Sequence, residues 1–97
     1  MLEQKQTVVA RMTAKPGRDK FVRKELIKLV EESRVEEGCI TFNLHQDNVD
    51  DHVFLIYENW ANYELLKKHM RSHPMAAFTE STIEVTQDFL VNEMTLI

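Results

Sequence analysis

The pattern of apolar and polar side chains, through alternation or through short apolar runs, predicts four β-strands along this chain. The alternation is clearest from Cys39 to Gln46 and partial from Gln6 to Ala14, and a period of two residues is typical of a strand with one buried face. A third strand is expected over Val53–Trp60, and a long last strand over Ile83–Thr95 with its apolar centre at Phe89-Leu90-Val91. The polar run between the second and third strands predicts a hairpin loop.

Two segments with a helical period separate these strands. From Arg18 to Glu37 apolar residues recur every three or four positions, which predicts an amphipathic helix of about five turns that Gly38 ends. Asn62 is a suitable N-cap for a second helix, and Pro74 is expected to end that helix or to break it into another short turn at Met75–Ser81. The apolar stripe of the first helix consists of Phe21, Val22, Leu26, Leu29 and Val30.

The predicted order of elements is β-α-β-β-α-β, without internal repeats or linkers. With right-handed crossovers this order gives an α+β, ferredoxin-like fold, in which a four-stranded antiparallel sheet carries both helices on one face. Residues 1–97 are expected to form a single domain, because a chain of 97 residues builds one hydrophobic core with little surplus.

The strand Val53–Trp60 is apolar on both of its faces. Phe54 and Ile56 lie on one face, whereas Val53, Leu55 and Tyr57 lie on the other. Helices on one side of the sheet leave the second apolar face without cover, and a second copy of the chain would supply it. The sequence therefore predicts a homodimer that packs sheet against sheet, of the dimeric α/β-barrel type.

Composition and charge exclude several classes of protein. A hydrophobic fraction of 43% with 29% charged residues is typical of a soluble globular domain. The net charge of −4 argues against a nucleic-acid partner, since phosphate binding needs a surplus of Lys and Arg. No apolar run approaches the roughly 20 residues that span a bilayer, so no membrane partner is expected. Cys39 is the only cysteine, which favours a reducing, cytoplasmic setting.

One histidine has the surroundings of a catalytic residue. A helical wheel places His69 between Leu65 and Leu66, on the buried side of the second predicted helix. Glu58 and Trp60 share one face of the preceding strand and lie just before the turn into this helix. A carboxylate near a partly buried imidazole raises its pKa and fixes its tautomer, which makes a working base. Glu58 and His69 are therefore candidate catalytic residues; the alternative is a core histidine that hydrogen-bonds to the backbone.

The other charged and histidine residues suggest no second site. His73 follows His69 by four residues, a spacing that can bind a metal from one helix face. Pro74 disfavours helical geometry at His73, and the spacing supplies no third ligand, so neither a metal nor another cofactor is expected. We expect His52 to be a solvated hairpin residue and Glu36-Glu37 to belong to a solvated helix face.

Three short motifs resemble those of a known family. They are Gly38-Cys39-Ile40-x-Phe42, then Tyr57-Glu58-Asn59-Trp60, and finally His69 with Ser72-His73-Pro74 and Phe78. Together they resemble the antibiotic biosynthesis monooxygenase family, and the resemblance covers essentially the whole chain. That family comprises small dimeric ferredoxin-like proteins, among them quinol monooxygenases, polyketide-oxidising enzymes and an isomerase that acts on a quorum-sensing sugar phosphate.

The resemblance implies a cofactor-independent monooxygenase that oxidises a quinol or a related small aromatic with dioxygen. His69 would be the base or hydrogen-bond donor and Glu58 its orienter, and the deprotonated substrate would reduce dioxygen without flavin, metal or haem. Many relatives carry a tyrosine where this chain has Phe42, so this chain lacks a phenol that could hydrogen-bond to substrate. The candidate substrate-binding residues are Trp60, Phe42, Phe78, Asn43 and His73.

Two other functions stay open at this point. The same Glu58 and His69 suit an acid–base isomerase of a small carbonyl or sugar-phosphate metabolite, which would not consume oxygen. The third function is that of a dimeric module that binds a small ligand without turnover, with His69 as a core residue. Oxygen consumption with a reduced naphthoquinol distinguishes the first function from the other two.

Overall fold

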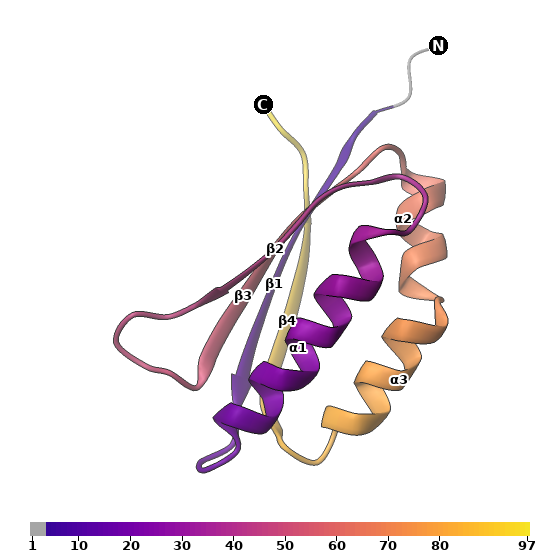
Figure 1. Cartoon of the computed structure of the whole chain (residues 1–97). Helices are drawn as coiled ribbons and strands as arrows, with labels where there is room; N and C mark the ends of the chain where they lie inside the picture. Colours follow the sequence, from indigo (N-terminus) through magenta and orange to yellow (C-terminus); the bar gives the residue numbers. More distant parts are fainter. Residues whose placement is uncertain (1–3) are drawn as a thin grey trace.

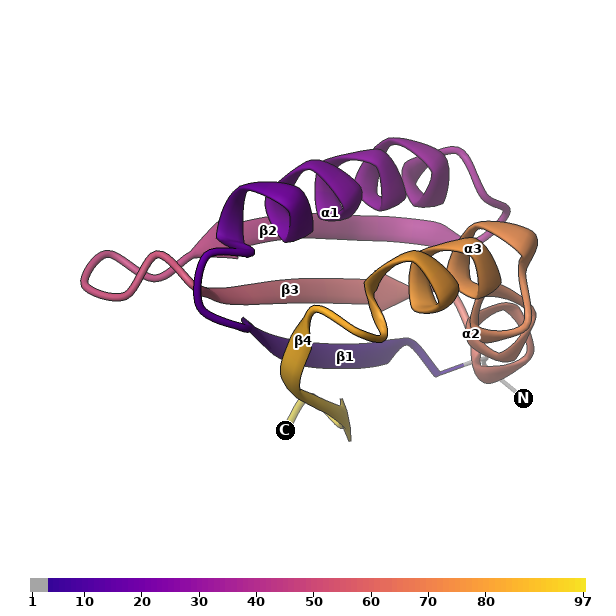
Figure 2. The ribbon, with the colours of Figure 1, turned by 90° about the horizontal axis from the view of Figure 1, so that it is seen from below.

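The computed structural model of the chain describes residues 4–97, so residues 1–3 of the predicted domain lie outside the described residues. The strands pair in the order β2-β3-β1-β4, and each pair is antiparallel. All the helices described lie on one face of this sheet (Figure 2), which confirms the predicted ferredoxin-like fold. The elements along the chain (Figure 1) are β1 (Gln6–Ala14), α1 (Asp19–Arg34), β2 (Cys39–Gln46), β3 (Val53–Trp60), α2 (Tyr63–Met70), α3 (His73–Thr82) and β4 (Thr86–Met94).

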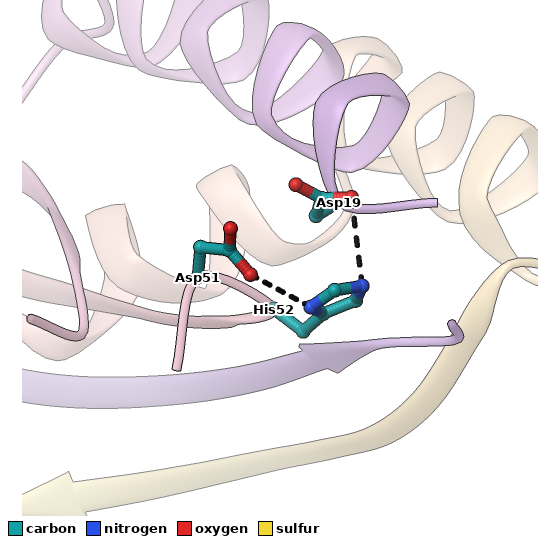
Figure 3. Close-up of side chains that lie close together, drawn as sticks. All are labelled: Asp19, Asp51 and His52. Atoms are coloured by element: carbon teal, nitrogen blue, oxygen red, sulfur yellow. Dashed lines mark hydrogen bonds and ion pairs between the residues drawn. The ribbon is translucent and has the colours of Figure 1, made fainter. Parts of the chain in front are cut away.

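His52 connects the β2–β3 hairpin to the start of α1 (Figure 3). Its Nδ1 lies 2.9 Å from Asp51 Oδ1, and its Nε2 lies 3.5 Å from Asp19 Oδ1. The backbone N–H of Gly17 donates to Nε2 at 3.3 Å. The prediction of a solvated His52 was wrong, because the ring bridges two loops and is only partly exposed.

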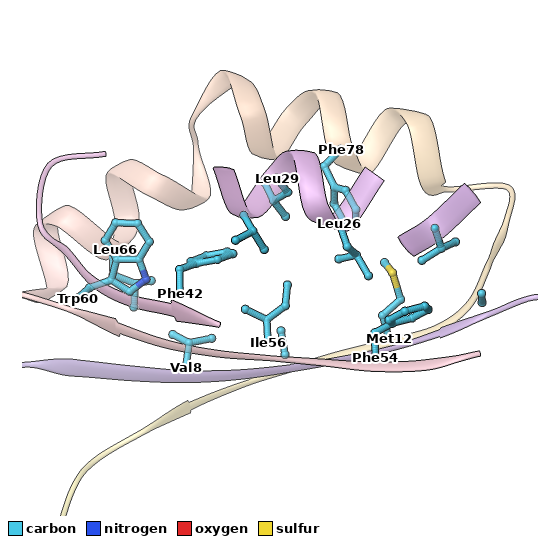
Figure 4. Close-up of a cluster of buried hydrophobic side chains, with 14 residues drawn as sticks. Val8, Met12, Leu26, Leu29, Phe42, Phe54, Ile56, Trp60, Leu66 and Phe78 are labelled. Atoms are coloured by element: carbon cyan, nitrogen blue, oxygen red, sulfur yellow. The ribbon is translucent and has the colours of Figure 1, made fainter. Parts of the chain in front are cut away.

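The hydrophobic core fills the space between the helices and one face of the sheet (Figure 4). The alternation of the strands turns every second residue toward the helices, as predicted. In α1 the buried residues recur at the predicted spacing, but Phe21 is exposed. The buried residues of β1 and β3 are Val8, Ala10, Met12, Ala14, Phe54, Ile56, Glu58 and Trp60.

Helix α1 ends at Arg34 and not at the predicted Glu37. Carboxylates at Glu36 and Glu37 are unfavourable at the negative end of a helix dipole, which disfavours another turn. The N–H of Glu36 donates to the carbonyl oxygen of Ser33 at 3.1 Å, and the carbonyl oxygen of Glu36 accepts from the N–H of Cys39 at 3.2 Å. Glu36 therefore belongs to the turn that leads into β2, not to the helix face.

A β-bulge changes the faces on which the start of β2 presents its side chains. The register against β3 shifts between Cys39 and Thr41. As a result Cys39 packs against the core, whereas Ile40 is exposed. Unbroken alternation from Cys39 to Gln46, as predicted, would place Ile40 on the face of Phe42; this part of the prediction was wrong, because the extra residue of a bulge interrupts the alternation.

The segment after β3 forms two helices. The Asn62 side chain accepts a hydrogen bond from the N–H of Leu65 at 2.9 Å, which confirms the predicted N-cap of α2. Pro74 lies in the first turn of α3, where its missing N–H costs no helical hydrogen bond, and Ser72 caps this helix. The expected short turn is thus a helix from His73 to Thr82. Within residues 4–97, no helix is both long and apolar enough to cross a membrane.

The second face of the sheet points away from the helices of the described chain. Val9 of β1 pairs with Tyr57 of β3 on this face, and Arg11 of β1 pairs with Leu90 of β4. Tyr57 is 40% exposed and Leu90 is also exposed, while Val9 is half-buried. The predicted second apolar face of the sheet is therefore present, and it is uncovered in the single chain.

Position 38 requires glycine for two reasons, its backbone conformation and its close contact with Leu65. Its φ is +84°, and a Cβ at this position would lie 2.8 Å from Cβ of Leu65. We expect Gly38→Ala to lower the free energy of unfolding by about 2–5 kcal/mol, because a left-handed backbone strain and an overpacking cost add together. Urea unfolding followed by circular dichroism measures this loss.

Gly17 provides the matched control. Its φ is +78°, but an added Cβ would meet no atom within 4 Å. Gly17→Ala should therefore show the backbone cost alone, about 1–2 kcal/mol. Equal losses in the two variants would show that the contact between Gly38 and Leu65 does not limit stability.

Candidate functional site

A cavity of about 390 Å³ lies between the sheet and helices α2 and α3. Its walls are mostly apolar, and its floor includes Ala10 of β1, whose small side chain leaves room above the sheet. The polar groups in the wall are Glu58, His69, Thr79, Thr82, Thr86 and Glu93. Among the described residues that line this cavity there is no Lys and no Arg. A cavity of this kind suits a small, largely apolar molecule without a phosphate or carboxylate group.

His69 reaches the cavity from the buried side of α2, as the helical wheel predicted. Its side chain is 3% exposed. The imidazole stacks on Trp60, with ring centroids 4.4 Å apart and planes inclined by 28°, and meets the ring of Phe42 edge-on at 5.5 Å. These two aromatic rings hold the imidazole in one orientation.

Two carboxyl groups approach the two nitrogens of His69. Glu36 Oε1 lies 3.1 Å from Nδ1, and Glu58 Oε1 lies 3.9 Å from Nε2. The closer carboxylate is thus Glu36, whereas the sequence predicted Glu58 as the orienting group. Burial lowers the pKa of His69 below its ordinary value, and the charge and hydrogen bond of Glu36 partly oppose this effect. The expected rise in the pKa of His69 was therefore wrong in sign.

Glu58 is the most unusual titratable group of the cavity. It is 5% exposed, and its Oε1 accepts a hydrogen bond from Trp60 Nε1 at 2.9 Å. Burial raises its pKa to about 7, although the bond from Trp60 lowers the pKa and the nearby Glu36 raises it further. A carboxyl group with a pKa near neutrality can donate or accept a proton at physiological pH, as an acid–base group requires.

Glu36 is the site residue that the sequence did not identify. The pattern placed it on a solvated helix face, and the early end of α1 turns it toward His69 instead. Its only sequence signal is a pair of glutamates directly before a glycine and a strand. This signal does not tell which of Glu36 and Glu37 points inward.

Of the predicted substrate-binding residues, only some lie near the cavity. Phe78 lines the cavity, as predicted. Trp60 and Phe42 are fully buried and pack against His69, so they support the site from behind and do not form its wall. Asn43 is exposed and accepts a hydrogen bond from Arg34 at 3.2 Å, and His73 is exposed at the start of α3; neither lines the cavity. The alternation of β2 directs Asn43 away from the helices.

The predicted absence of a metal concerned His69 and His73. These two residues lie in different helices, one buried and one exposed, so they do not form the single helix face that the spacing allowed. In the described residues, three ligand atoms within 4.8 Å of one another occur at Asp19, Asp51 and His52. This group lies at the hairpin, and none of the three lines the cavity.

The raised pKa of Glu58 predicts a pH-dependent stability. The pKa of this carboxyl is about 7 in the folded chain against an ordinary value of 4.5, so the folded state binds the proton more tightly. The resulting stabilisation is complete below pH 4.5 and is lost as the pH rises through 7, by about 3 kcal/mol. Glu58→Gln keeps the shape but cannot ionise. Urea unfolding from pH 4.5 to 8 should show the wild type losing about this much relative to Glu58→Gln.

Comparing the wild type with Glu58→Gln separates the effect of Glu58 on stability from that of His69. The lowered pKa of His69 acts in the opposite direction, since its stabilisation is present above pH 6.5 and is lost as the pH falls. Glu64→Gln removes an exposed carboxylate of α2 and should leave the pH profile unchanged. A difference between wild type and Glu58→Gln that stays constant with pH would contradict the raised pKa.

Two sequence relatives share part of this chain. It is 34% identical over 65 residues to the uncharacterized protein YjcS of Bacillus subtilis, a match that covers 66% of this chain and 62% of YjcS. It is also 34% identical over 53 residues to the uncharacterized protein sll1783 of Synechocystis, which covers 55% of this chain and 36% of that protein. The chain therefore matches less than two thirds of the length of either relative.

The structural likeness extends over the whole chain. The crystal structure of PA3566 from Pseudomonas aeruginosa superposes with a TM-score of 0.94 at 29% identity, covering 100% of this chain and 98% of that one. A crystal structure of an antibiotic biosynthesis monooxygenase superposes with a TM-score of 0.89 at 25% identity, covering 95% and 98%. The family model for antibiotic biosynthesis monooxygenases matches residues 6–81. With this match over most of its length, the chain belongs to the antibiotic biosynthesis monooxygenase family.

Proposed function

We propose that this protein is a cofactor-independent monooxygenase that oxidises a quinol or a related small aromatic with dioxygen. The observation that carries the proposal is the apolar cavity with the Glu58–His69 pair in its wall. Its volume of about 390 Å³ falls in the range of small-molecule sites and accommodates a fused aromatic ring system. The family supports a monooxygenase-like activity.

The charges of the cavity favour this substrate over a phosphorylated one. A phosphate group needs cationic side chains or several converging N–H donors. The titratable groups that line the cavity in the described chain are Glu58, His69 and Glu93, which would repel an anion or leave it unpaired. A phenolic hydroxyl instead donates a hydrogen bond to an imidazole nitrogen or a carboxylate. The sugar-phosphate isomerase therefore has less support than the quinol oxygenase.

The proposed reaction needs only proton transfer from the protein. His69 Nε2 accepts the proton of a substrate hydroxyl, and the resulting anion is electron-rich enough to reduce dioxygen. The mostly apolar walls would reduce the number of water molecules around the reactive anion. With 1,4-naphthoquinol, one oxygen atom enters the ring and the other leaves as water, so that four electrons pass from the substrate to dioxygen. Glu58 is placed to exchange the proton that the departing water requires.

The first test is the activity of a His69 variant. With a reduced naphthoquinol in an oxygen electrode, His69→Ala should lower turnover by about 10²–10⁴, the usual effect of removing an acid–base group. His73→Ala is the matched control, because His73 is an exposed histidine outside the cavity. Thermal unfolding of both variants shows whether the fold is kept. Full activity in a folded His69→Ala protein would exclude this residue as the base.

We also propose that the protein is a homodimer joined through the uncovered face of its sheets. Apolar side chains on this face, among them Val9, Tyr57 and Leu90, support the proposal because water is a poor environment for exposed apolar surface. A stable association of this kind buries more than roughly 1,200 Å² in total.

A charge on this face should dissociate the dimer. Tyr57→Glu places a carboxylate at the centre of the proposed interface, so light scattering at micromolar concentration should give the mass of one chain, against two for the wild type. Val35→Glu is the control, because Val35 is 85% exposed at the end of α1 and should not affect association. A wild-type mass of one chain would overturn the proposed dimer.

A further inference from the structure

The two carboxyl groups beside His69 face different surroundings. Glu58 lines the cavity together with His69. Glu36 lines a second, polar pocket on the surface, which it shares with Lys68, Arg71 and Ser72. The side chain of Glu36 is 20% exposed, against 7% for Glu58. His69 therefore connects the apolar cavity, which it lines, to Glu36 of the surface pocket.

The contact with Glu36 determines which nitrogen of His69 carries the proton. Both oxygens of Glu36 lie close to Nδ1, at 3.1 and 3.3 Å. An ionised carboxylate only accepts hydrogen bonds, so Nδ1 must donate. In the neutral ring Nε2 is then unprotonated, and this is the nitrogen on the side of Glu58.

The backbone holds Glu36 in place for this contact. Its N–H donates to Ser33 and its carbonyl oxygen accepts from Cys39, so both sides of the residue are fixed in the turn between α1 and β2. The neighbouring Glu37 points elsewhere, since its Oε1 lies 3.4 Å from Nζ of Lys68 on α2. One glutamate of the pair thus orients the histidine, and the other forms an exposed ion pair.

We propose that Glu36 is a positioning residue of this site: it holds His69 as the Nδ1–H tautomer and passes the proton taken from the substrate to the surface pocket. This inference rests on the proposed oxygenase function. In the step, a bond forms between Nε2 and the substrate's hydroxyl proton while the O–H bond breaks. The Nδ1–H bond then breaks toward the carboxylate of Glu36, which releases the proton to solvent. The substrate keeps the electron pair as an anion, and His69 is left as the Nε2–H tautomer. The ring returns to the Nδ1–H form when Nε2 gives its proton to the departing water and Nδ1 takes back a proton, which Glu36 has drawn from solvent.

The other groups around His69 are compatible with this route. From β3 come Glu58 and Trp60, and from β2 comes Phe42; Cys39 at the start of β2 interacts electrostatically with Glu58 and Glu36. The pKa of the Cys39 thiol is raised, first by burial and then by the charges of Glu58 and Glu36. The thiol is therefore protonated at neutral pH and does not compete for the proton.

The tautomer is measurable without any substrate. Long-range ¹H–¹⁵N spectra of the wild type should show His69 as the Nδ1–H form. Glu36→Gln keeps an acceptor oxygen and should retain this tautomer, whereas Glu36→Leu removes the acceptor and should shift the ring toward the Nε2–H form. Glu37→Leu is the matched control and should leave His69 unchanged. An Nε2–H tautomer in the wild type would overturn the positioning role.

The proton route is tested by turnover of a reduced naphthoquinol. Glu36→Ala should lower kcat at least about 10-fold with little change in KM, since Glu36 lies outside the substrate cavity, and Glu37→Ala should not. Because the lost carboxylate faces a surface pocket, added acetate should restore kcat of Glu36→Ala in proportion to its concentration. Wild-type kcat in Glu36→Ala, or a lowered kcat that acetate does not restore, would overturn the route.

The tautomer spectra and the turnover measurements together distinguish a failure of this inference from a failure of the proposed function. If the wild type converts no quinol, the oxygenase function and the proton route fall together. The tautomer of His69 still decides whether Glu36 positions the ring. If the wild type turns over and Glu36→Ala matches it, the function stands and the role of Glu36 does not.

Discussion

The site depends on burying the carboxyl group of Glu58 within an apolar sheet face. In register, Glu58 lies between Val8 of β1 and Phe42 of β2, so both of its cross-strand neighbours are apolar. An ionised carboxylate loses its hydration there, at a cost that only a partner or a bound proton offsets. The indole N–H of Trp60 supplies one partner, and the raised pKa lets a proton supply the rest. Trp60 can do so because residues two apart on a strand share a face.

The position of Trp60 in turn determines that of His69. The indole is held by its bond to Glu58 and by the core, and the imidazole stacks on it. Helix α2 is short, and its cap at Asn62 fixes where it begins relative to the end of β3. The candidate pair of Glu58 and His69 is thus positioned by one strand, one turn and one helix that are contiguous in the chain. Glu36 is the part of the site that comes from a distant segment.

The spacing of apolar residues predicted correctly the elements that follow a regular strand or helix period. The bounds of β1 and β2 follow from alternation, those of β3 follow from its apolar run, and the inward position of His69 follows from the helical period. The patterns gave wrong bounds or wrong faces where the backbone departs from a regular period. These places are the end of α1, the bulge beside Cys39 and helix α3, which begins at His73. The first and third depend on local charges, caps and hydrogen bonds, and the bulge depends on pairing with β3; the apolar–polar pattern contains none of these.

The same failures explain the errors in the predicted site. Glu36 was missed because its contact with His69 spans 33 positions of the chain and needs the early end of α1. Trp60 and Phe42 were expected to bind substrate, but they contact His69 and do not line the cavity, since an apolar residue type does not distinguish a cavity wall from the layer behind it. The position of Asn43, in contrast, follows from the sequence, since the alternation of β2 assigns this residue to the face of the sheet opposite the cavity.

The cavity and the proposed dimer face lie on opposite sides of the same strands. Val8 and Glu58 face the cavity side, and the adjacent Val9 and Tyr57 face the uncovered side. A shift of register by one residue would exchange these two sets, exposing the carboxyl of Glu58 on the outer face and burying Tyr57 under the helices. The different side chains required on the two faces therefore specify one register between β1 and β3. A partner on the outer face would reinforce the register that keeps Glu58 beside His69, so association and the geometry of the site are linked through the backbone of β1 and β3.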